Sequence, residues 1–167
     1  DLIKRGVDKR KISVILNGVD LDRYQPVESK NCELTKKYEL ENKFVVGYVG
    51  THGLAHGLGV ILDAAERLQE NSDVIFLMVG SGAVKQYLVQ SADDRGLTNV
   101  LFVDRQPKEM MAAYWSLCDI SFIHLKNEQL FSSVIPSKLF ESMGMGIPVI
   151  MAIPEGEGTA IVREHGC

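Results

Sequence analysis

The sequence has few cysteines and no apolar run long enough to cross a bilayer. The three cysteines, Cys32, Cys118 and Cys167, are far apart in a chain of 167 residues and show no metal-ligand spacing. This pattern argues against a disulfide framework and favours a reducing compartment. Because the sequence shows neither a signal peptide nor a membrane span, we expect a cytoplasmic location.

The chain also lacks an excess of positive charge. Its 18 Lys and Arg residues stand against 22 Asp and Glu residues, which gives a net charge of −4. No overall positive field attracts a nucleic-acid backbone, so we expect no nucleic-acid partner. A phosphate-bearing ligand must therefore be held by a local group of donors.

Apolar runs of strand length alternate with helical patterns from residue 44 onward. The runs at 44–49, 74–79, 100–103, 119–124 and 147–150 predict five strands. Such alternation is typical of an α/β, Rossmann-like doubly wound parallel sheet. Ligands of such sheets bind at the carboxyl ends of the strands, so the loops after each strand are the candidate sites.

The first thirty residues are charged and contain one short apolar run, residues 12–16, which leads into Asn17-Gly18-Val19-Asp20. This stretch predicts a strand, a turn and a linker. We expect residues 1–30 to be an interdomain linker with a remnant of a neighbouring domain. Residues 31–167 are then the Rossmann-like domain, truncated at its C-terminus.

The loop after the first strand, residues 50–57, holds three glycines and two histidines. Glycines let the backbone approach a ligand closely, and the following helix N-terminus offers free N–H groups to a diphosphate. A flexible turn explains the same glycines equally well. His52 and His56 are four residues apart, but no carboxylate completes a known metal pattern, so we expect no metal site. An imidazole that donates to phosphate is the better interpretation.

A second group of residues opens the helix predicted after Pro136. Ser137, Lys138 and Glu141 lie on one flank of that helix. A hydroxyl, an ammonium and a helix N-terminus together neutralise a diphosphate, and a carboxylate one turn later accepts both hydroxyls of a ribose. The alternative is a solvated helix start in which Lys138 and Glu141 form a weak surface pair.

Two further loops are weaker candidates. Arg105 and Gln106 follow the third strand, where backbone groups could contact the edge of a base, and Gly80 follows the second strand. Trp115 falls on a helical stripe and is expected in the core rather than in a site.

Taken together, these segments resemble the C-terminal domain of the family 4 glycosyltransferases, retaining enzymes of the two-domain GT-B architecture. Residues 17–20 are similar to the family's interdomain NGVD segment, and residues 76–82 to its second strand with a G-x-G turn. Residues 118–120 resemble the entry to its fourth strand, and residues 141–150 its E-A-M-A-x-G-x-P-V-I block.

The chain departs from this family at three positions. Thr51 and His56 stand where many members have an arginine and a lysine that contact the donor diphosphate, and Ser133 replaces the first of two glutamates eight positions apart. Residues 136–141 instead look like the P-S-K-x-F-E segment of a subgroup that builds bacterial surface polysaccharides, such as O-antigen and capsule.

The resemblance implies transfer of a hexose or an N-acetylated amino sugar from a nucleoside diphosphate, most simply UDP, with retained configuration and no metal or other cofactor. It implies a missing N-terminal acceptor domain, a lipid-linked saccharide acceptor and peripheral attachment at the inner face of the plasma membrane. Lys138 and His56 are the expected catalytic residues. The expected donor-binding residues are Gly50, Thr51, Gly53, Gly80, Arg105, Gln106, Ser133, Ser137 and Glu141.

Other functions fit the same architecture. A sugar-nucleotide epimerase needs further carboxylates and histidines poised for proton abstraction, and these loops offer few. A receiver-like domain needs an acidic cluster after the first strand, where this chain has Gly50-Thr51-His52. A non-catalytic nucleotide-binding role also stays open, because nothing in the sequence is a catalytic nucleophile.

Overall fold

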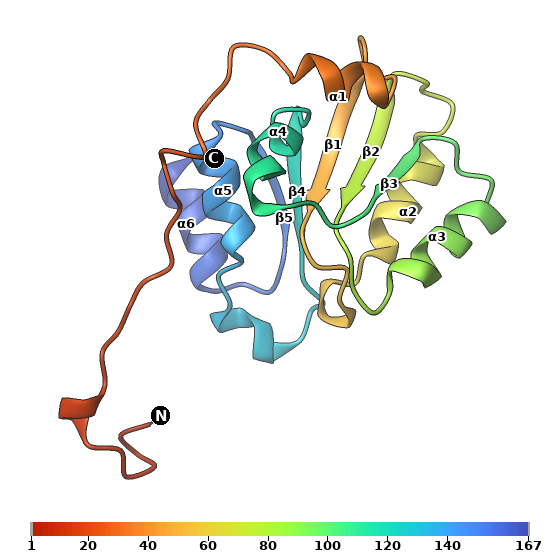
Figure 1. Cartoon of the computed structure of the whole chain (residues 1–167). Coiled ribbons are helices and arrows are strands. Elements are labelled where there is room, and N and C mark those ends of the chain that lie inside the picture. The colour runs from red at the N-terminus through yellow and green to blue at the C-terminus, as the bar shows by residue number, and fades with distance from the viewer. Residues whose placement is uncertain (1, 167) are drawn as a thin grey trace.

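A computed structural model describes residues 2–166, which contain a five-stranded parallel sheet (Figure 1). The strands are β1 (Phe44–Val49), β2 (Val74–Val79), β3 (Val100–Val103), β4 (Ile120–His124) and β5 (Val149–Ala152). Their order is β3-β2-β1-β4-β5, and every neighbouring pair is parallel. The predicted α/β, Rossmann-like fold is therefore confirmed.

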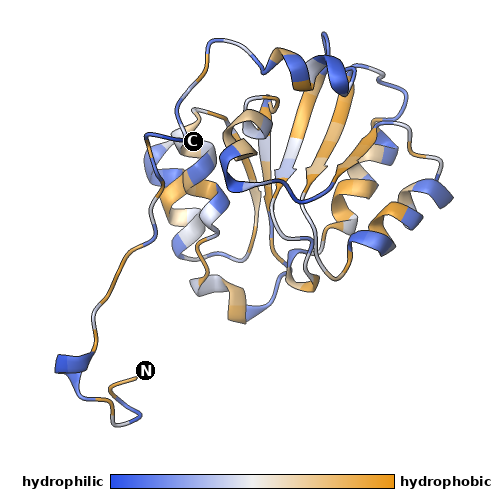
Figure 2. Ribbon diagram, viewed as in Figure 1, coloured by the Kyte–Doolittle hydropathy of each residue, from blue (hydrophilic) through white to orange (hydrophobic). Residues whose placement is uncertain are grey.

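Helices follow the strands as the alternating pattern predicts. They are α2 (Gly59–Arg67), α3 (Lys85–Asp94), α4 (Met111–Trp115), α5 (Ser137–Gly144) and α6 (Glu157–His165). A six-residue helix, α1 (Cys32–Lys37), precedes β1 and was not predicted. The 3-10 turns are η1 (Lys9–Lys11), η2 (Leu54–His56), η3 (Lys108–Met110) and η4 (Gln129–Ser133). Figure 2 shows that the strands are mostly hydrophobic, whereas the helices contain both hydrophilic and hydrophobic residues.

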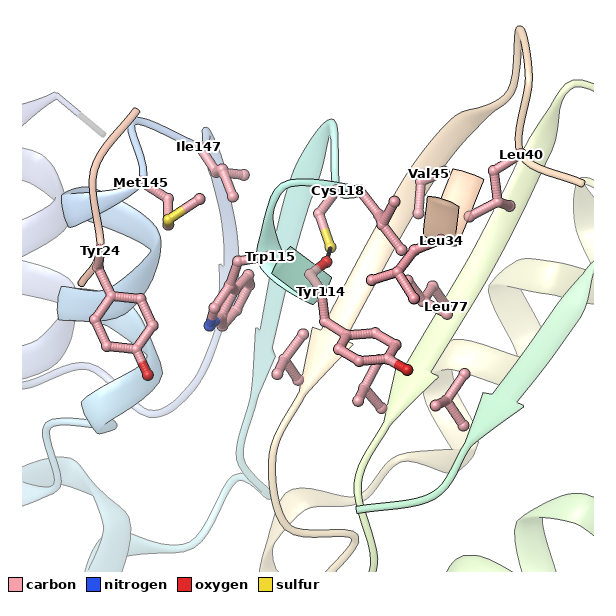
Figure 3. Packing of buried hydrophobic residues seen from close by; sticks show 14 residues of the cluster. Tyr24, Leu34, Leu40, Val45, Leu77, Tyr114, Trp115, Cys118, Met145 and Ile147 are labelled. Carbon is pink, nitrogen blue, oxygen red and sulfur yellow. Dashed lines mark hydrogen bonds between the residues drawn. The ribbon is translucent and has the colours of Figure 1, made fainter. Parts of the chain in front are cut away.

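The inner strands β1 and β2 are largely buried on both faces, which explains why they are continuously apolar, whereas Ile150 of the edge strand β5 is exposed. Along β1, Val45 and Val49 belong to one core cluster, while Tyr48 belongs to the other. The first cluster includes Trp115 of α4, whose side chain is fully buried (Figure 3). The second includes Leu62 of α2. The prediction that Trp115 is a core residue is confirmed.

The strand order reverses between β1 and β4. The chain proceeds from β1 outward through β2 to β3 and then returns to the other side of β1. The loops that leave β1 and β4 therefore diverge, and a crevice opens at their carboxyl ends. This reversal positions the candidate site.

The strand predicted at residues 12–16 is wrong. Residues 12–20 have no regular secondary structure, and Val14, Ile15 and Leu16 are 81%, 91% and 84% exposed. A strand needs a neighbour that satisfies its backbone hydrogen bonds, and no strand within residues 2–166 pairs with this segment. Figure 1 shows it leading away from the domain.

Two strand boundaries also differ from the prediction. Asp119 precedes β4, and its carboxylate accepts a hydrogen bond from the Val45 N–H at 2.7 Å and pairs with the Lys30 ammonium. The fifth strand starts at Val149 rather than at residue 147, because Ile147 turns into the first core cluster.

Within the described residues, no helix has the length and apolar character that a bilayer crossing requires.

Gly47 is expected to be a packing constraint at the centre of the sheet. A Cβ there would lie 2.2 Å from Cys118 Sγ and 2.9 Å from Cys118 Cβ. We expect Gly47→Ala to lower the free energy of unfolding by about 1–3 kcal/mol in urea titrations, because the buried thiol cannot move away. Gly59→Ala is the control, since a Cβ at Gly59 meets nothing within 4 Å. Equal stability of the two variants would contradict this account.

Candidate functional site

Two adjoining cavities lie at the carboxyl edge of the sheet, beside the reversal of strand order. Their volumes are about 400 and 250 Å³. Both are lined by Gly50, Thr51, Met111 and Glu141, so we treat them as one cleft and name it the sheet-edge cleft. Its walls come from the loops after β1, β2 and β3 and from the first turns of α5.

Most of the residues singled out in the sequence line this cleft. The larger cavity is lined by Gly50, Thr51, Gly80, Arg105, Gln106 and Glu141. The smaller cavity is lined by Gly50, Thr51, His56, Ser137, Lys138 and Glu141. Gly53 and Ser133 line neither cavity. Gly53 precedes η2 and faces the His56 ring, and Ser133 is an exposed residue at the end of η4.

Glycines allow the loops of the cleft to touch. Gly80 has a φ of 146°, and a Cβ on it would lie 1.9 Å from the Gly50 carbonyl oxygen. Gly50 has a φ of 142°, and a Cβ on it would lie 3.2 Å from Lys138 Cε. Any larger residue at either position would separate these segments, so the glycines close the floor of the cleft.

The two loops are also joined by a lysine. Lys85 Nζ donates to the carbonyl oxygens of Gly80 and Val103, both at 3.0 Å, and to the Asp104 carboxylate at 2.6 Å. This ion pair holds the pKa of Asp104 below its usual range. The contact holds the segment that carries Arg105 and Gln106 next to the Gly80 turn.

Lys138 is a buried cation rather than a surface one. Its side chain is 7% exposed, and Nζ donates to the Tyr48 hydroxyl at 3.0 Å while lying 4.1 Å from the centre of the Tyr48 ring. Burial lowers the pKa of Lys138 to about 8, and the nearby Glu141 carboxylate opposes that decrease. The alternative of a solvated Lys138–Glu141 surface pair is therefore wrong.

Glu141 faces the cleft with one oxygen already engaged. Its Oε2 accepts a hydrogen bond from Trp115 Nε1 at 2.9 Å. Because Trp115 is fully buried in the core, this bond fixes the rotamer of the carboxylate. The other oxygen is left to accept from a ligand hydroxyl.

The two histidines of the first loop are neutral. Burial, aided by Lys138, lowers the pKa of His56, whose Nδ1 lies 3.4 Å from the His124 carbonyl oxygen. Burial also lowers the pKa of His52 to about 4, with Lys85 and Lys138 contributing. His52 is completely buried, and neither ring nitrogen has a hydrogen-bond partner within residues 2–166. Because the His124 carbonyl oxygen can only accept, the proton of the neutral His56 ring is on Nδ1, and Nε2 is an acceptor in the ligand-free protein.

Several lining residues escaped sequence reasoning. Tyr24, Lys108 and Met111 also line the larger cavity. Met111 lies on the same helical stripe as the core residue Tyr114, so the sequence pattern predicts a core position for it rather than a position at the cleft. Tyr24 is brought to the cleft only because the segment after residue 20 packs against α5, where a Cβ on Gly144 would lie 3.1 Å from the Tyr24 carbonyl oxygen.

No group of three His, Cys, Asp or Glu side chains within residues 2–166 is arranged to hold a metal ion. The polar side chains that line the smaller cavity are those of Thr51, His56, Ser137, Lys138 and Glu141. The first turn of α5 has no side-chain cap. The Leu139 N–H donates to the Pro136 carbonyl oxygen at 3.0 Å, and the N–H groups of Ser137 and Lys138 are the ones left for a ligand.

The chain has a Rossmann-like sheet and a cleft with a lysine and a glycine floor, and it is similar to known proteins. Residues 31–166 match the family of glycosyl transferases group 1. The chain belongs to this family. Its membership favours a glycosyltransferase over the epimerase and receiver alternatives.

Individual relatives agree with this assignment. The chain is 29% identical over 146 residues to WcaI of Escherichia coli K12, described as a candidate colanic acid biosynthesis glycosyl transferase; the match covers 86% of this chain and 35% of WcaI. Anabaena HepE, solved in complex with UDP and glucose, has a TM-score of 0.73 and 22% identity over 96% of this chain and 42% of HepE. The chain thus spans less than half of either protein.

A third relative matches this chain over most of the length of both. The C-terminal domain of LpcC, a group 1 family glycosyl transferase from Francisella tularensis, has a TM-score of 0.66 and 17% identity over 89% of this chain and 86% of that domain. At such identity the two structures show a shared fold, which is that of the GT-B glycosyltransferases.

His52 makes stability depend on pH. The unfolded chain binds a proton on this imidazole near pH 6.5, whereas the folded protein does so only near pH 4. Between these values the unfolded state binds more protons, so the free energy of unfolding falls as pH decreases, by up to roughly 3 kcal/mol. Urea titrations from pH 7 to pH 4 measure this loss.

We expect His52→Met to remove that part of the pH dependence. His165→Gln, at the exposed end of α6, is the matched control and should keep the wild-type slope. If His52→Met loses stability over this range as steeply as the wild type, the buried imidazole is not its source.

Proposed function

We propose that this chain is the donor-binding, C-terminal half of a retaining glycosyltransferase, and that the sheet-edge cleft binds a nucleoside diphosphate sugar. The observation that carries the proposal is the pairing of a buried cation, Lys138, with a fixed carboxylate, Glu141, one turn apart on α5 at a glycine-floored cleft. A nucleoside diphosphate has both matching chemistries, a dianionic phosphate chain and a ribose diol.

In this proposal the diphosphate lies against the start of α5. Lys138, the Ser137 hydroxyl and the N–H groups of Ser137 and Lys138 donate to it, and His56, which lines the same cavity, donates through Nε2 when its ring is protonated. As the glycosidic bond breaks, negative charge grows on the diphosphate, and donors already in place stabilise that charge. Since these groups neutralise the diphosphate, the proposed reaction requires no metal.

The nucleoside is proposed to extend into the larger cavity. The free Glu141 oxygen accepts the ribose hydroxyls, and the base reaches the segment of Arg105 and Gln106 over the Gly80 turn. Gly50 and Thr51 lie between the two cavities, where the phosphates pass. Gly53 and Ser133 lie outside both cavities, and we give them no direct contact with the donor.

UDP is the proposed nucleotide, with a hexose or an N-acetylated amino sugar as the group transferred. The structure of HepE with UDP and glucose supports this choice through its shared fold. The relationship to WcaI supports a role in bacterial surface polysaccharide synthesis, such as O-antigen or capsule.

The acceptor is proposed to bind to a second domain. The matched part of WcaI and of HepE is less than half of each protein, and the LpcC domain that this chain resembles is a C-terminal one. The exposed apolar segment at residues 12–16 then belongs to the linker that joins the halves, with residues 31–167 as the donor domain. A lipid-linked saccharide at the inner face of the plasma membrane is the proposed acceptor.

Nucleotide titration tests the donor site directly. We expect UDP to bind this chain in calorimetry without added metal, and more tightly than GDP or ADP. Glu141→Gln should weaken UDP binding roughly ten- to hundredfold, because a charged hydrogen-bond acceptor for the ribose is lost. The amide oxygen can still accept from Trp115, which separates loss of binding from loss of folding.

Glu164→Ala is the matched control, because this carboxylate is exposed on α6 away from the cleft. It should leave UDP affinity unchanged. The proposal fails if neither this chain nor the full-length protein binds any of the three nucleotides at millimolar concentration. For the full-length protein, the anomeric proton coupling of the product in NMR distinguishes retention from inversion.

A further inference from the structure

Tyr48 is a residue of β1 that contacts the Lys138 ammonium, although it lines neither cavity of the sheet-edge cleft. Its side chain is 1% exposed, and burial raises the pKa of its hydroxyl well above the usual range. The His52 and His56 rings lie 5.7 and 6.0 Å from its ring centre. A phenylalanine would fill the same space, so packing alone does not require the hydroxyl.

The Tyr48 hydroxyl donates one hydrogen bond and accepts another. It donates its only proton to the Thr51 carbonyl oxygen at 2.7 Å. Its lone pairs are therefore available to the Lys138 ammonium, which donates to it at 3.0 Å. The result is a directed chain of hydrogen bonds from α5 through β1 to the loop after β1.

This chain determines which way the ammonium points. A lysine ammonium has three N–H groups, and Tyr48 takes one of them. The Tyr48 ring covers one side of Nζ at 4.1 Å from its centre, and the Gly50 backbone lies next to Cε. The two remaining N–H groups are left for the cleft.

We infer that Tyr48 is a positioning residue: it fixes the Lys138 ammonium and the Thr51 backbone together, so that a diphosphate meets a cation that is already oriented. This inference rests on the proposed function, because the diphosphate is its ligand. A flexible lysine must lose side-chain entropy when it binds phosphate, whereas this one has lost it on folding.

Other titratable groups also face Lys138. They are Tyr48 from β1, His52 and His56 from the following loop, and Glu141 from α5 itself. Among them only Tyr48 makes a hydrogen bond to Nζ within the described residues. Its removal therefore isolates the contact that orients the ammonium.

The decisive variant is Tyr48→Phe, with affinities for UDP and for uridine measured by calorimetry or ligand-observed NMR. We expect UDP binding to weaken about tenfold, the size of one hydrogen bond to a charged group, and uridine binding to change less than about twofold. Tyr114→Phe is the matched control. It removes another buried tyrosine hydroxyl, which lies 3.1 Å from the Tyr38 hydroxyl in the first core cluster, and should leave both affinities unchanged.

A double-mutant cycle shows whether Tyr48 acts through Lys138. When Lys138 is replaced by methionine, the further change Tyr48→Phe should alter UDP affinity less than about twofold. The inference is overturned if Tyr48→Phe leaves UDP affinity unchanged, weakens UDP and uridine alike, or has its full effect in Lys138→Met.

A measurement without nucleotide keeps this inference separate from the proposed function. The proton affinity of the Lys138 amine can be measured by NMR titration of the ligand-free protein. We expect it to be about tenfold lower in Tyr48→Phe, because the Tyr48 hydroxyl stabilises the ammonium more than it stabilises the neutral amine. An unchanged proton affinity overturns the positioning role. Failure of UDP to bind the wild type, with the NMR change present, overturns the proposed donor instead.

Discussion

Burial of the Lys138 ammonium costs free energy, and the arrangement of the cleft follows from the groups that offset this cost. The Tyr48 hydroxyl and ring solvate one side of the charge, and Glu141 supplies a carboxylate one turn away. Gly50 leaves room for the end of the lysine side chain. The contacts of Lys138 with Tyr48 and Gly50 join β1 and the loop after it to α5. The cleft is therefore assembled around its cation, and the donors are in place before a ligand arrives.

The parallel sheet provides the frame for that assembly. Because strand order reverses between β1 and β4, the loop after β1 and the start of α5 meet across the crevice. Trp115 in the core also reaches this edge, where its indole N–H holds Glu141. The same residue thus stabilises the fold and orients a site carboxylate, so that packing and binding are physically coupled.

The positive charge of the cleft does not come from the loop after β1. Thr51 and the neutral His56 bring no charge to the loop after β1. The cation of the smaller cavity comes from α5 instead, and it is held by a tyrosine of β1. Arg105 and Lys108 add positive charge at the larger cavity, where the nucleoside is proposed to lie.

The amino-acid sequence by itself determined the five parallel strands and the helices between them, since continuous apolar runs and helical stripes are local patterns. It also pointed to residues 50–57 and 136–141, because glycine, lysine and carboxylate spacing is readable along the chain. The segment at 12–16 has the same apolar pattern as a strand, yet pairing depends on a neighbour that these residues lack within the part of the chain that the structure describes. Only the tertiary structure decided that Lys138 is buried, that Tyr48 holds it and that Trp115 orients Glu141. Those facts depend on contacts between residues 26 to 90 positions apart, which no local pattern records.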